Sequence, residues 1–122
     1  MTHSKYEREF ATRFAQLGTD LPPYIEEYQF SDRKFRFDFA WPEPQHKVAV
    51  EVDGGNNLVV YSRKLKRHVA VGRHTKMKDY EKLNLATSLG WRVLRITPEM
   101  LRKDPLGVME TLKGMLIKED AK

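Results

Sequence analysis

Two carboxylates stand on neighbouring apolar stretches of the chain, within FRFDFAWPEPQHKVAVEVDGG at residues 35–55. Asp38 lies in an alternation of phenylalanines and Glu51 in an alternation of valines, so both acids fall on expected β-strands. The intervening WPEPQHK predicts a hairpin, and a turn centred near Pro44 and Gln45 puts Asp38 opposite Glu51 on one face. Like charges so paired, with Cβ atoms only ~5 Å apart, are destabilising. A divalent cation would relieve this repulsion.

This pair of acids is suited to a hard divalent cation. Mg²⁺ typically takes one or two protein carboxylates together with water and substrate phosphate, and Mn²⁺ accepts similar oxygen ligands. Such an ion polarises a phosphoryl oxygen and activates water, while a nearby lysine stabilises the charge that develops. Asp38 and Glu51 are therefore candidate ligands in the hydrolysis of a phosphodiester. The chain has no cysteine, and its four histidines are scattered without an H-x-x-H spacing, so a zinc site is not expected.

The elements that must position the acids follow from the periodicity of the chain. A first helix is expected from a capping box at residues 4–7 to about Leu17, with an apolar stripe at helical spacing. A strand is predicted near Tyr28–Phe30, before the two acidic strands. The rest of the order α-β-β-β-α-β-α is a helix from about Lys76 to Leu89, a strand WRVLRIT parallel to residues 47–53, and a last helix from Asp104-Pro105 to about Lys118. This pattern predicts an α/β fold with a mixed central sheet flanked by helices.

Length and composition limit the class of protein. The 122 residues predict one domain over residues 1–122, and the formal net charge of +5 allows a polyanionic partner. No apolar run approaches the ~20 residues of a membrane span, so no membrane partner is expected. The lack of cysteine favours a reducing, cytoplasmic location.

Much of the positive charge follows the second acidic strand. Residues 58–74 form a basic segment in which LVVY and HVAV flank a charged tip, and this predicts a projecting hairpin or loop. Such a cluster is either a solvated basic face or a DNA contact, and its position next to the acids favours DNA. His74 is either a general acid or base, a phosphate contact or a plain surface histidine. The candidate DNA-binding residues are Arg36, Arg63, Lys64, Lys66, Arg67, Arg73, His74 and Lys76.

The two acidic strands resemble the D-X₁₂-E-X-K core of the PD-(D/E)XK nuclease superfamily, with Asp38 and Glu51 in its acidic positions. The resemblance implies a restriction-endonuclease-like core and a Mg²⁺-dependent endodeoxyribonuclease in which Mn²⁺ substitutes. It also implies that the backbone carbonyl of Val52 joins the two acids as a metal ligand. Where the motif has its lysine, however, this chain has Asp53, which can add a metal ligand but no positive charge.

A lysine on the following helix can replace the missing one. Asp79 and Lys82 lie on the face of the expected helix that must cover the sheet. Lys82 is therefore either the catalytic substitute or the partner of Asp79 in a helix salt bridge.

Two groups within the superfamily are similar to this chain. YEREF resembles the first helix of archaeal-type Holliday junction resolvases, which places Glu7 at their first-helix glutamate. Glu7 is also the expected capping-box residue, but it projects closer to the buried stripe than Glu9 does. EVDG at residues 51–54 and GWRVLR at residues 90–95 resemble segments of very-short-patch-repair endonucleases.

The function expected from these resemblances is that of a Holliday junction resolvase. Such an enzyme would work as a homodimer and make paired symmetric nicks in four-way DNA junctions. One alternative is a monomeric nicking or repair endonuclease of the very-short-patch type. The other is an inactive DNA-binding module with a nuclease fold, because the motif lysine is missing. If a dimer forms, the last helix with Leu112, Met115 and Leu116 is a candidate interface, provided that part of its apolar stripe stays exposed.

Overall fold

A four-stranded mixed sheet forms the centre of the protein, for which a computed structural model describes residues 5–53, 59–70 and 73–117. Its spatial order is β1-β2-β3-β6. β2 pairs antiparallel with both β1 and β3, and β6 pairs parallel to β3 as predicted. The strands are β1 (Ile25–Gln29), β2 (Arg36–Trp41), β3 (Val48–Val52) and β6 (Arg92–Ile96).

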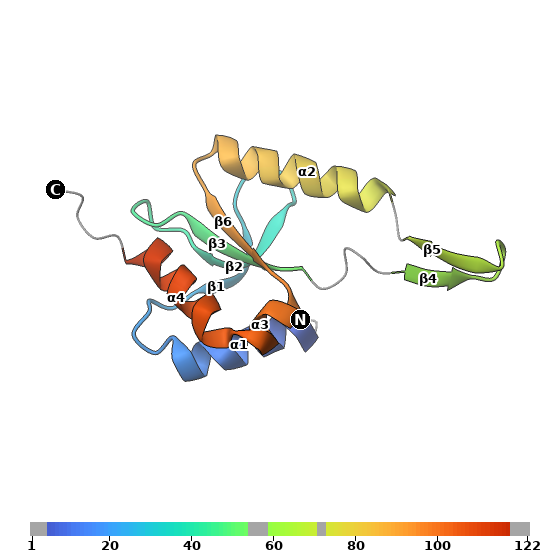
Figure 1. Cartoon of the computed structure of the whole chain (residues 1–122). Coiled ribbons are helices and arrows are strands. Elements are labelled where there is room, and N and C mark those ends of the chain that lie inside the picture. The colour runs from blue at the N-terminus through green and yellow to red at the C-terminus, as the bar shows by residue number, and fades with distance from the viewer. Residues whose placement is uncertain (1–4, 54–58, 71–72, 118–122) are drawn as a thin grey trace.

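Helices cover both faces of this sheet, which confirms the expected α/β class. Figure 1 shows α2 on one face and α1, α3 and α4 on the other. The expected order matches the observed one only roughly, because it lacked a separate α3 and the strands of the basic segment. The helices are α1 (Lys5–Leu17), α2 (Arg73–Ser88), α3 (Pro98–Lys103) and α4 (Pro105–Leu116).

Local sequence explains where two of the helices begin. The α4 helix starts at Pro105 because Asp104 is its N-cap and accepts a hydrogen bond from the backbone N–H of Gly107 at 3.0 Å. Thr97 caps α3 in the same way, with the N–H of Met100 at 3.1 Å. Gly90, whose φ is 86°, follows α2 in the left-handed conformation that ends many helices.

The hydrophobic core has two parts, one on each face of the sheet. On the α1 side, Phe39, Trp41, Val50 and Ile96 of the sheet pack with residues of α1, α3 and α4, including the fully buried Phe10. On the α2 side a smaller cluster contains Phe37, Ala40, Ala49, Ala86 and Trp91. β2 and β3 therefore lie between helices that pack on both faces of the sheet.

The side-chain alternation of β2 breaks at Asp38. A regular strand would place Phe37 and Phe39 on the same face, yet Phe37 packs on the α2 side and Phe39 on the α1 side. The register of β1 and β2 places Glu27 opposite this point, and Glu27 has a φ of 51°, which non-glycine residues adopt uncommonly. Both strands are therefore distorted where the first acid stands.

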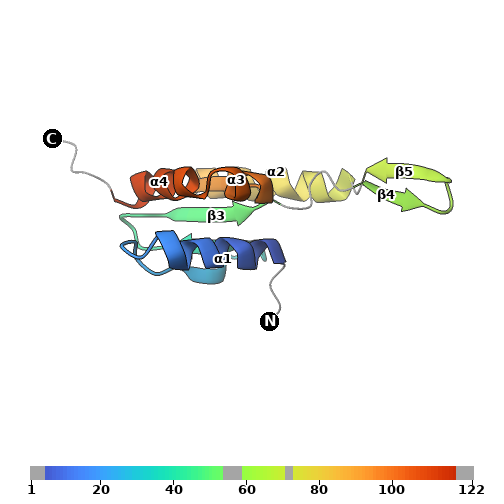
Figure 2. The ribbon, with the colours of Figure 1, turned by 60° about the horizontal axis from the view of Figure 1, so that its bottom comes forward.

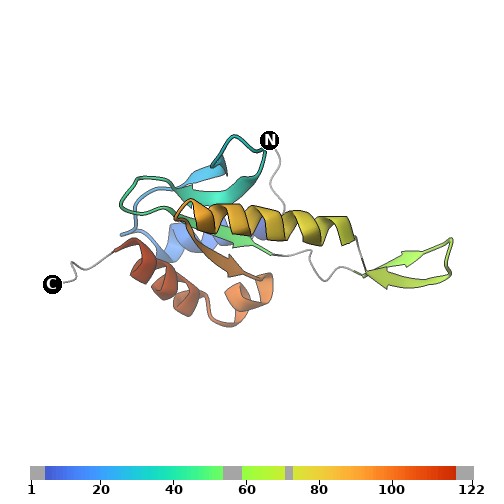
Figure 3. The ribbon, with the colours of Figure 1, turned by 90° about the horizontal axis from the view of Figure 1, so that it is seen from above.

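The basic segment forms a second, two-stranded sheet, as the sequence predicts. It consists of β4 (Val59–Ser62) and β5 (Arg67–Ala70), joined by a turn at residues 63–66. Figures 2 and 3 show this hairpin projecting beyond α2 and away from the central sheet. Among the described helices, none combines the length and the apolar character required to cross a bilayer.

The candidate dimer face on the last helix is contradicted by the structure. Leu112 and Leu116 are almost completely buried, and Met115 packs against the same core. The stripe is therefore part of the protein's own interior, because α4 lies against the sheet together with α1. The exposed apolar side chains in this region are instead Leu106 and Ile117.

Candidate active site

The carboxylates of Asp38 and Glu51 each accept a hydrogen bond from the backbone of the opposite strand, β3 or β2. The register pairs Phe39 with Val50, so the next position brings Asp38 opposite Glu51, as the predicted turn requires. The backbone N–H of Asp38 donates to Oε2 of Glu51 at 2.9 Å, and the N–H of Val52 donates to Oδ2 of Asp38 at 2.8 Å. Each carboxylate thus binds the backbone of the opposite strand, which fixes both side chains in position.

Lys82 reaches the second of these acids from α2. Its Nζ donates a hydrogen bond to Oε1 of Glu51, and only 14% of the lysine and 16% of the glutamate side chain are exposed. The aliphatic part of the lysine extends past Phe37, with Nζ 5.7 Å from the ring centroid. Lys82 therefore lies beside the acids of β2 and β3, and its ion-pair partner is Glu51.

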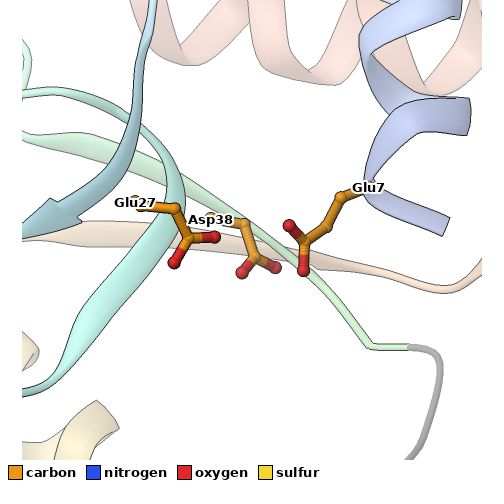
Figure 4. Close-up of side chains that lie close together, drawn as sticks. All are labelled: Glu7, Glu27 and Asp38. Carbon is orange, nitrogen blue, oxygen red and sulfur yellow. The ribbon is translucent and has the colours of Figure 1, made fainter. Parts of the chain in front are cut away.

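Asp38 also belongs to a cluster of three carboxylates. One oxygen atom each of Glu7, Glu27 and Asp38 lies within 4.8 Å of the others, and all three side chains are half-buried. Figure 4 shows Glu7 entering from the start of α1, Glu27 from β1 and Asp38 from β2. Clustered carboxylate oxygens are the donor set that Mg²⁺ and Mn²⁺ prefer, so these residues fit a hard divalent cation. The predicted ligand set of Asp38, Glu51 and the carbonyl of Val52 shares Asp38 with this cluster and stays a prediction.

The crowding of acids changes the protonation of Asp38. Burial raises the pKa of its carboxyl from 3.8 to about 7, and the negative charges of Glu51 and Glu7 contribute to the increase. The hydrogen bond from Val52 and the positive charge of Lys82 act in the opposite direction but are weaker. Positive charge is therefore insufficient at Asp38, and a cation bound between the carboxylates would favour its ionised form.

Asp53 and Asp79 share a cation of their own. The guanidinium of Arg95 lies 2.7 Å from Oδ2 of Asp53 and 3.6 Å from Oδ2 of Asp79. Arg95 of β6 thus supplies a positive charge beside Asp53. The parallel register of β3 and β6 brings it there, because it pairs Arg95 with Glu51. Together these side chains line a hollow of about 160 Å³, whose walls are Glu7, Asp38, Glu51, Val52, Asp53, Asp79 and Arg95.

The two glutamates at the start of α1 differ as expected. Glu7 lines the hollow, whereas Glu9 forms two hydrogen bonds with Arg102 of α3, at 3.0 and 3.1 Å. The side chain of Glu9 is 23% exposed and is held by that arginine outside the hollow. Its partner is on α3, which packs against α1.

The candidate DNA-binding residues lie at the start of β2 and within residues 58–76. Arg36 is exposed at the start of β2, and the side chains at the hairpin turn are exposed as well. The side chains of Arg73, His74 and Lys76 lie outside the described part of the structure, so those three predictions stay predictions. The exposed residues at the turn are Arg63, Lys64, Lys66 and Arg67.

Sequence reasoning missed Glu27 and Arg95. The signal for Arg95 was the GWRVLR strand, whose parallel pairing with β3 was predicted without its register. Glu27 lies in IEEYQ, whose exposure along β1 does not follow a simple alternation, and its unusual φ is invisible in the sequence. A register for β1 against β2 would have been needed to place Glu27 opposite Asp38.

Comparison with known proteins adds evidence from the fold. No protein-family model matches the chain, and no curated protein matches its sequence. A solved structure described as the catalytic domain of the homing endonuclease I-Bth0305I superposes with a TM-score of 0.57, over 91% of this chain and 93% of that one. The chain has a nuclease-like fold. At 22% identity the similarity concerns the fold alone, and the chemistry must be argued from the site.

Proposed function

We propose that the protein is a metal-dependent endodeoxyribonuclease of the PD-(D/E)XK superfamily. The observation that carries this proposal is the convergence of Glu7, Glu27 and Asp38 on one point, beside a lysine held by Glu51. The fold shared with the catalytic domain of a homing endonuclease supports the same reaction class. The cofactor proposed is Mg²⁺, with Mn²⁺ as a substitute, because the donor set consists of carboxylate oxygens.

The proposed roles follow from the positions of the side chains. A divalent cation held by Asp38 and its neighbouring glutamates would supply Lewis-acid polarisation of the phosphodiester. Lys82 stabilises the negative charge that develops on the phosphoryl oxygens, and Glu51 holds its ammonium group in place. Asp53 acts through Arg95, which it orients at the wall of the hollow.

DNA is the proposed substrate because exposed positive charge is concentrated at the turn of the basic hairpin. This hairpin projects beyond the sheet, where its cations can neutralise phosphates of a bound nucleic acid. Phosphate contacts of this kind position a duplex without reading its bases. We therefore expect recognition of DNA shape more than of sequence.

The finer proposal is a Holliday junction resolvase acting as a homodimer. It is supported by Glu7, which occupies the hollow from the first helix as the resemblance to junction resolvases requires. A four-way junction has approximate two-fold symmetry, so a symmetric dimer can place one site on each of two opposed strands. The alternative is a monomeric nicking endonuclease of the very-short-patch type, which the EVDG and GWRVLR segments favour. An inactive DNA-binding module is the third possibility.

One set of cleavage assays distinguishes the resolvase, the nicking endonuclease and the inactive DNA-binding module. The wild-type protein is incubated with four-way junctions and with linear duplex of the same sequence, with and without Mg²⁺. We expect Mg²⁺-dependent cleavage that Glu51→Gln and Asp38→Asn each abolish, while DNA binding is unchanged or stronger because a negative charge near phosphate is removed. Paired nicks in junctions by a dimer support the resolvase, and equal cleavage of linear duplex by a monomer supports the nicking enzyme. Wild-type rates in Glu51→Gln would refute the proposed site.

A further inference from the structure

Phe35 is an aromatic side chain that packs with neither part of the core. It stands immediately before β2 and is half-buried, but the two clusters of the described residues leave it out, although Phe30 and Phe37 belong to the α2-side cluster. Its ring lies instead beneath the guanidinium of Arg33, whose Cζ is 4.8 Å from the ring centroid. Packing in the hydrophobic core therefore does not account for an aromatic residue at position 35.

The ring forms part of a surface pocket of about 390 Å³. Arg33, Lys34 and Phe35 line it from the β1–β2 loop, and Lys78 and Glu81 line it from α2. Three cations, one acid and one aromatic face thus surround the pocket. Nη2 of Arg33 lies 3.3 Å from Oε1 of Glu81. The two side chains are 58% and 52% exposed, so this ion pair is weak and opens easily.

The pocket lies close to the candidate active site along two elements. On α2, Lys78 stands one turn before Lys82, a distance of ~6 Å along the helix axis. On the strand side, Phe35 precedes Asp38 by three residues, which is ~10 Å of extended chain. Since neighbouring nucleotides of one DNA strand are ~3.4 Å apart along a duplex, the pocket is about two or three nucleotides from a phosphate bound at Asp38.

We propose that this pocket binds one unstacked nucleotide of the DNA substrate, with its base against Phe35 and its backbone phosphate near Lys34 and Lys78. The inference rests on the proposed function and extends it, because it names a substrate contact away from the cleaved bond. A phosphate alone would need only the cations, whereas an aromatic ring in the wall of the pocket offers a face against which a base can pack. Base–aromatic stacking accepts every base, and Arg33 and Glu81 offer a donor and an acceptor to the base edge.

A nucleotide pocket of this kind has a consequence for substrate choice. A base must leave its stack before it can contact Phe35, and that step costs least where pairing is already disturbed. The pocket therefore favours branched, mismatched or single-stranded DNA over a regular duplex. This preference comes from DNA deformation and needs no contact with a particular base sequence.

The experiment is an abasic scan read by binding. Substrates that each lack one base, at successive positions around the cleavage site, are titrated with wild-type protein in EDTA so that no strand is cut. We expect one position, two or three nucleotides from the cleaved phosphate, to weaken binding about 5- to 150-fold, which corresponds to ~1–3 kcal/mol. Phe35→Leu should abolish that penalty, and Phe35→Trp should restore it.

A matched control separates the pocket from aromatic exposure in general. Tyr80 of α2 is an aromatic residue that is 61% exposed and does not line the pocket, so Tyr80→Leu should keep the penalty. A penalty of equal size at all positions, or one that Phe35→Leu leaves unchanged, overturns the inference. Absence of Mg²⁺-dependent cleavage together with the expected abasic profile would instead refute the nuclease proposal and leave the nucleotide pocket supported.

Discussion

The substitution Asp38→Asn should stabilise the metal-free protein at alkaline pH. The folded-state pKa of Asp38 is raised to about 7, above its ordinary value of 3.8. The folded protein therefore holds this proton more tightly than the unfolded chain does. The resulting stabilisation is complete below pH 3.8 and is lost as the pH rises from about 4 through about 7. At pH 8 the ionised carboxylate then makes folding less favourable.

The size of this effect follows from the pKa difference. At ~1.36 kcal/mol per pKa unit, the interval from 3.8 to about 7 corresponds to on the order of 4 kcal/mol. Asparagine removes the charge and keeps an oxygen that can accept the hydrogen bond from Val52. We expect Asp38→Asn to increase the free energy of unfolding at pH 8 by about 2–4 kcal/mol, and at pH 4 by less than about 1 kcal/mol.

Urea unfolding in EDTA at several pH values provides the measurement, with Glu51→Gln as the control. Lys82 is largely buried against Glu51, so removal of that carboxylate charge leaves an ammonium group without its ion-pair partner. The control should therefore gain no stability, although it removes one acid from the same pair. Mg²⁺ should stabilise the wild type at pH 8 and have less effect on Asp38→Asn, because binding to the folded state is linked to stability.

Two results would refute this reasoning. Equal stability of wild type and Asp38→Asn at pH 8 in EDTA would mean that the carboxylate is not under electrostatic strain. A gain that is equally large at pH 4 would mean that the effect comes from packing or from the unfolded state and not from ionisation. Either result would remove the electrostatic argument for a cation at this cluster.

Lys82→Ala should lower kcat by about 10²–10³-fold with little loss of DNA affinity, as for removal of an oxyanion donor. Lys64→Ala should instead weaken binding and reduce its salt dependence, with near-normal turnover at saturation; matching kinetics in the two variants would exclude the catalytic lysine. Glu27→Gln should raise the Mg²⁺ concentration required for half-maximal cleavage, and Glu26→Gln, its neighbour in β1, should not; identical Mg²⁺ titrations would remove Glu27 from the metal site. Deletion of the turn at residues 63–66, closed by a short Asn-Gly turn, should weaken junction binding without changing thermal stability, because the hairpin projects away from the core. Unchanged junction affinity would exclude the hairpin as a DNA contact.

The sequence allowed the acidic pair to be placed because short-range rules govern it. WPEPQHK is short, so the hairpin has one natural register, and the observed pairing of Phe39 with Val50 follows from it. Lys82 could be found for a similar reason, since helical spacing places it on the face of α2 that covers the sheet. Both predictions depend on elements that are adjacent in the chain or strictly periodic.

Glu27 and Arg95 could not be placed in this way. The position of Arg95 beside Glu51 depends on the register of a parallel pair, which is set after a long crossover through the hairpin and α2. Glu27 depends on a backbone distortion opposite Asp38 that no residue type signals, because a glutamate with positive φ is uncommon. The burial of Leu112 and Leu116 also escaped prediction, since an apolar stripe on a helix does not say which surface covers it.

The hydrogen bonds that the carboxylates of Asp38 and Glu51 accept from the opposite strand restrict how this protein can change by mutation. An aliphatic residue at either position would leave a backbone N–H of the opposite strand without its acceptor, at a cost of ~1–3 kcal/mol. Asparagine and glutamine keep an acceptor oxygen while they abolish the charge. A lineage that lost the chemistry but kept the fold should therefore carry an amide at position 38, and an amide at position 51 together with a neutral residue in place of Lys82. Homologues with such amides would be expected to retain the surface that binds and to have lost only the reaction.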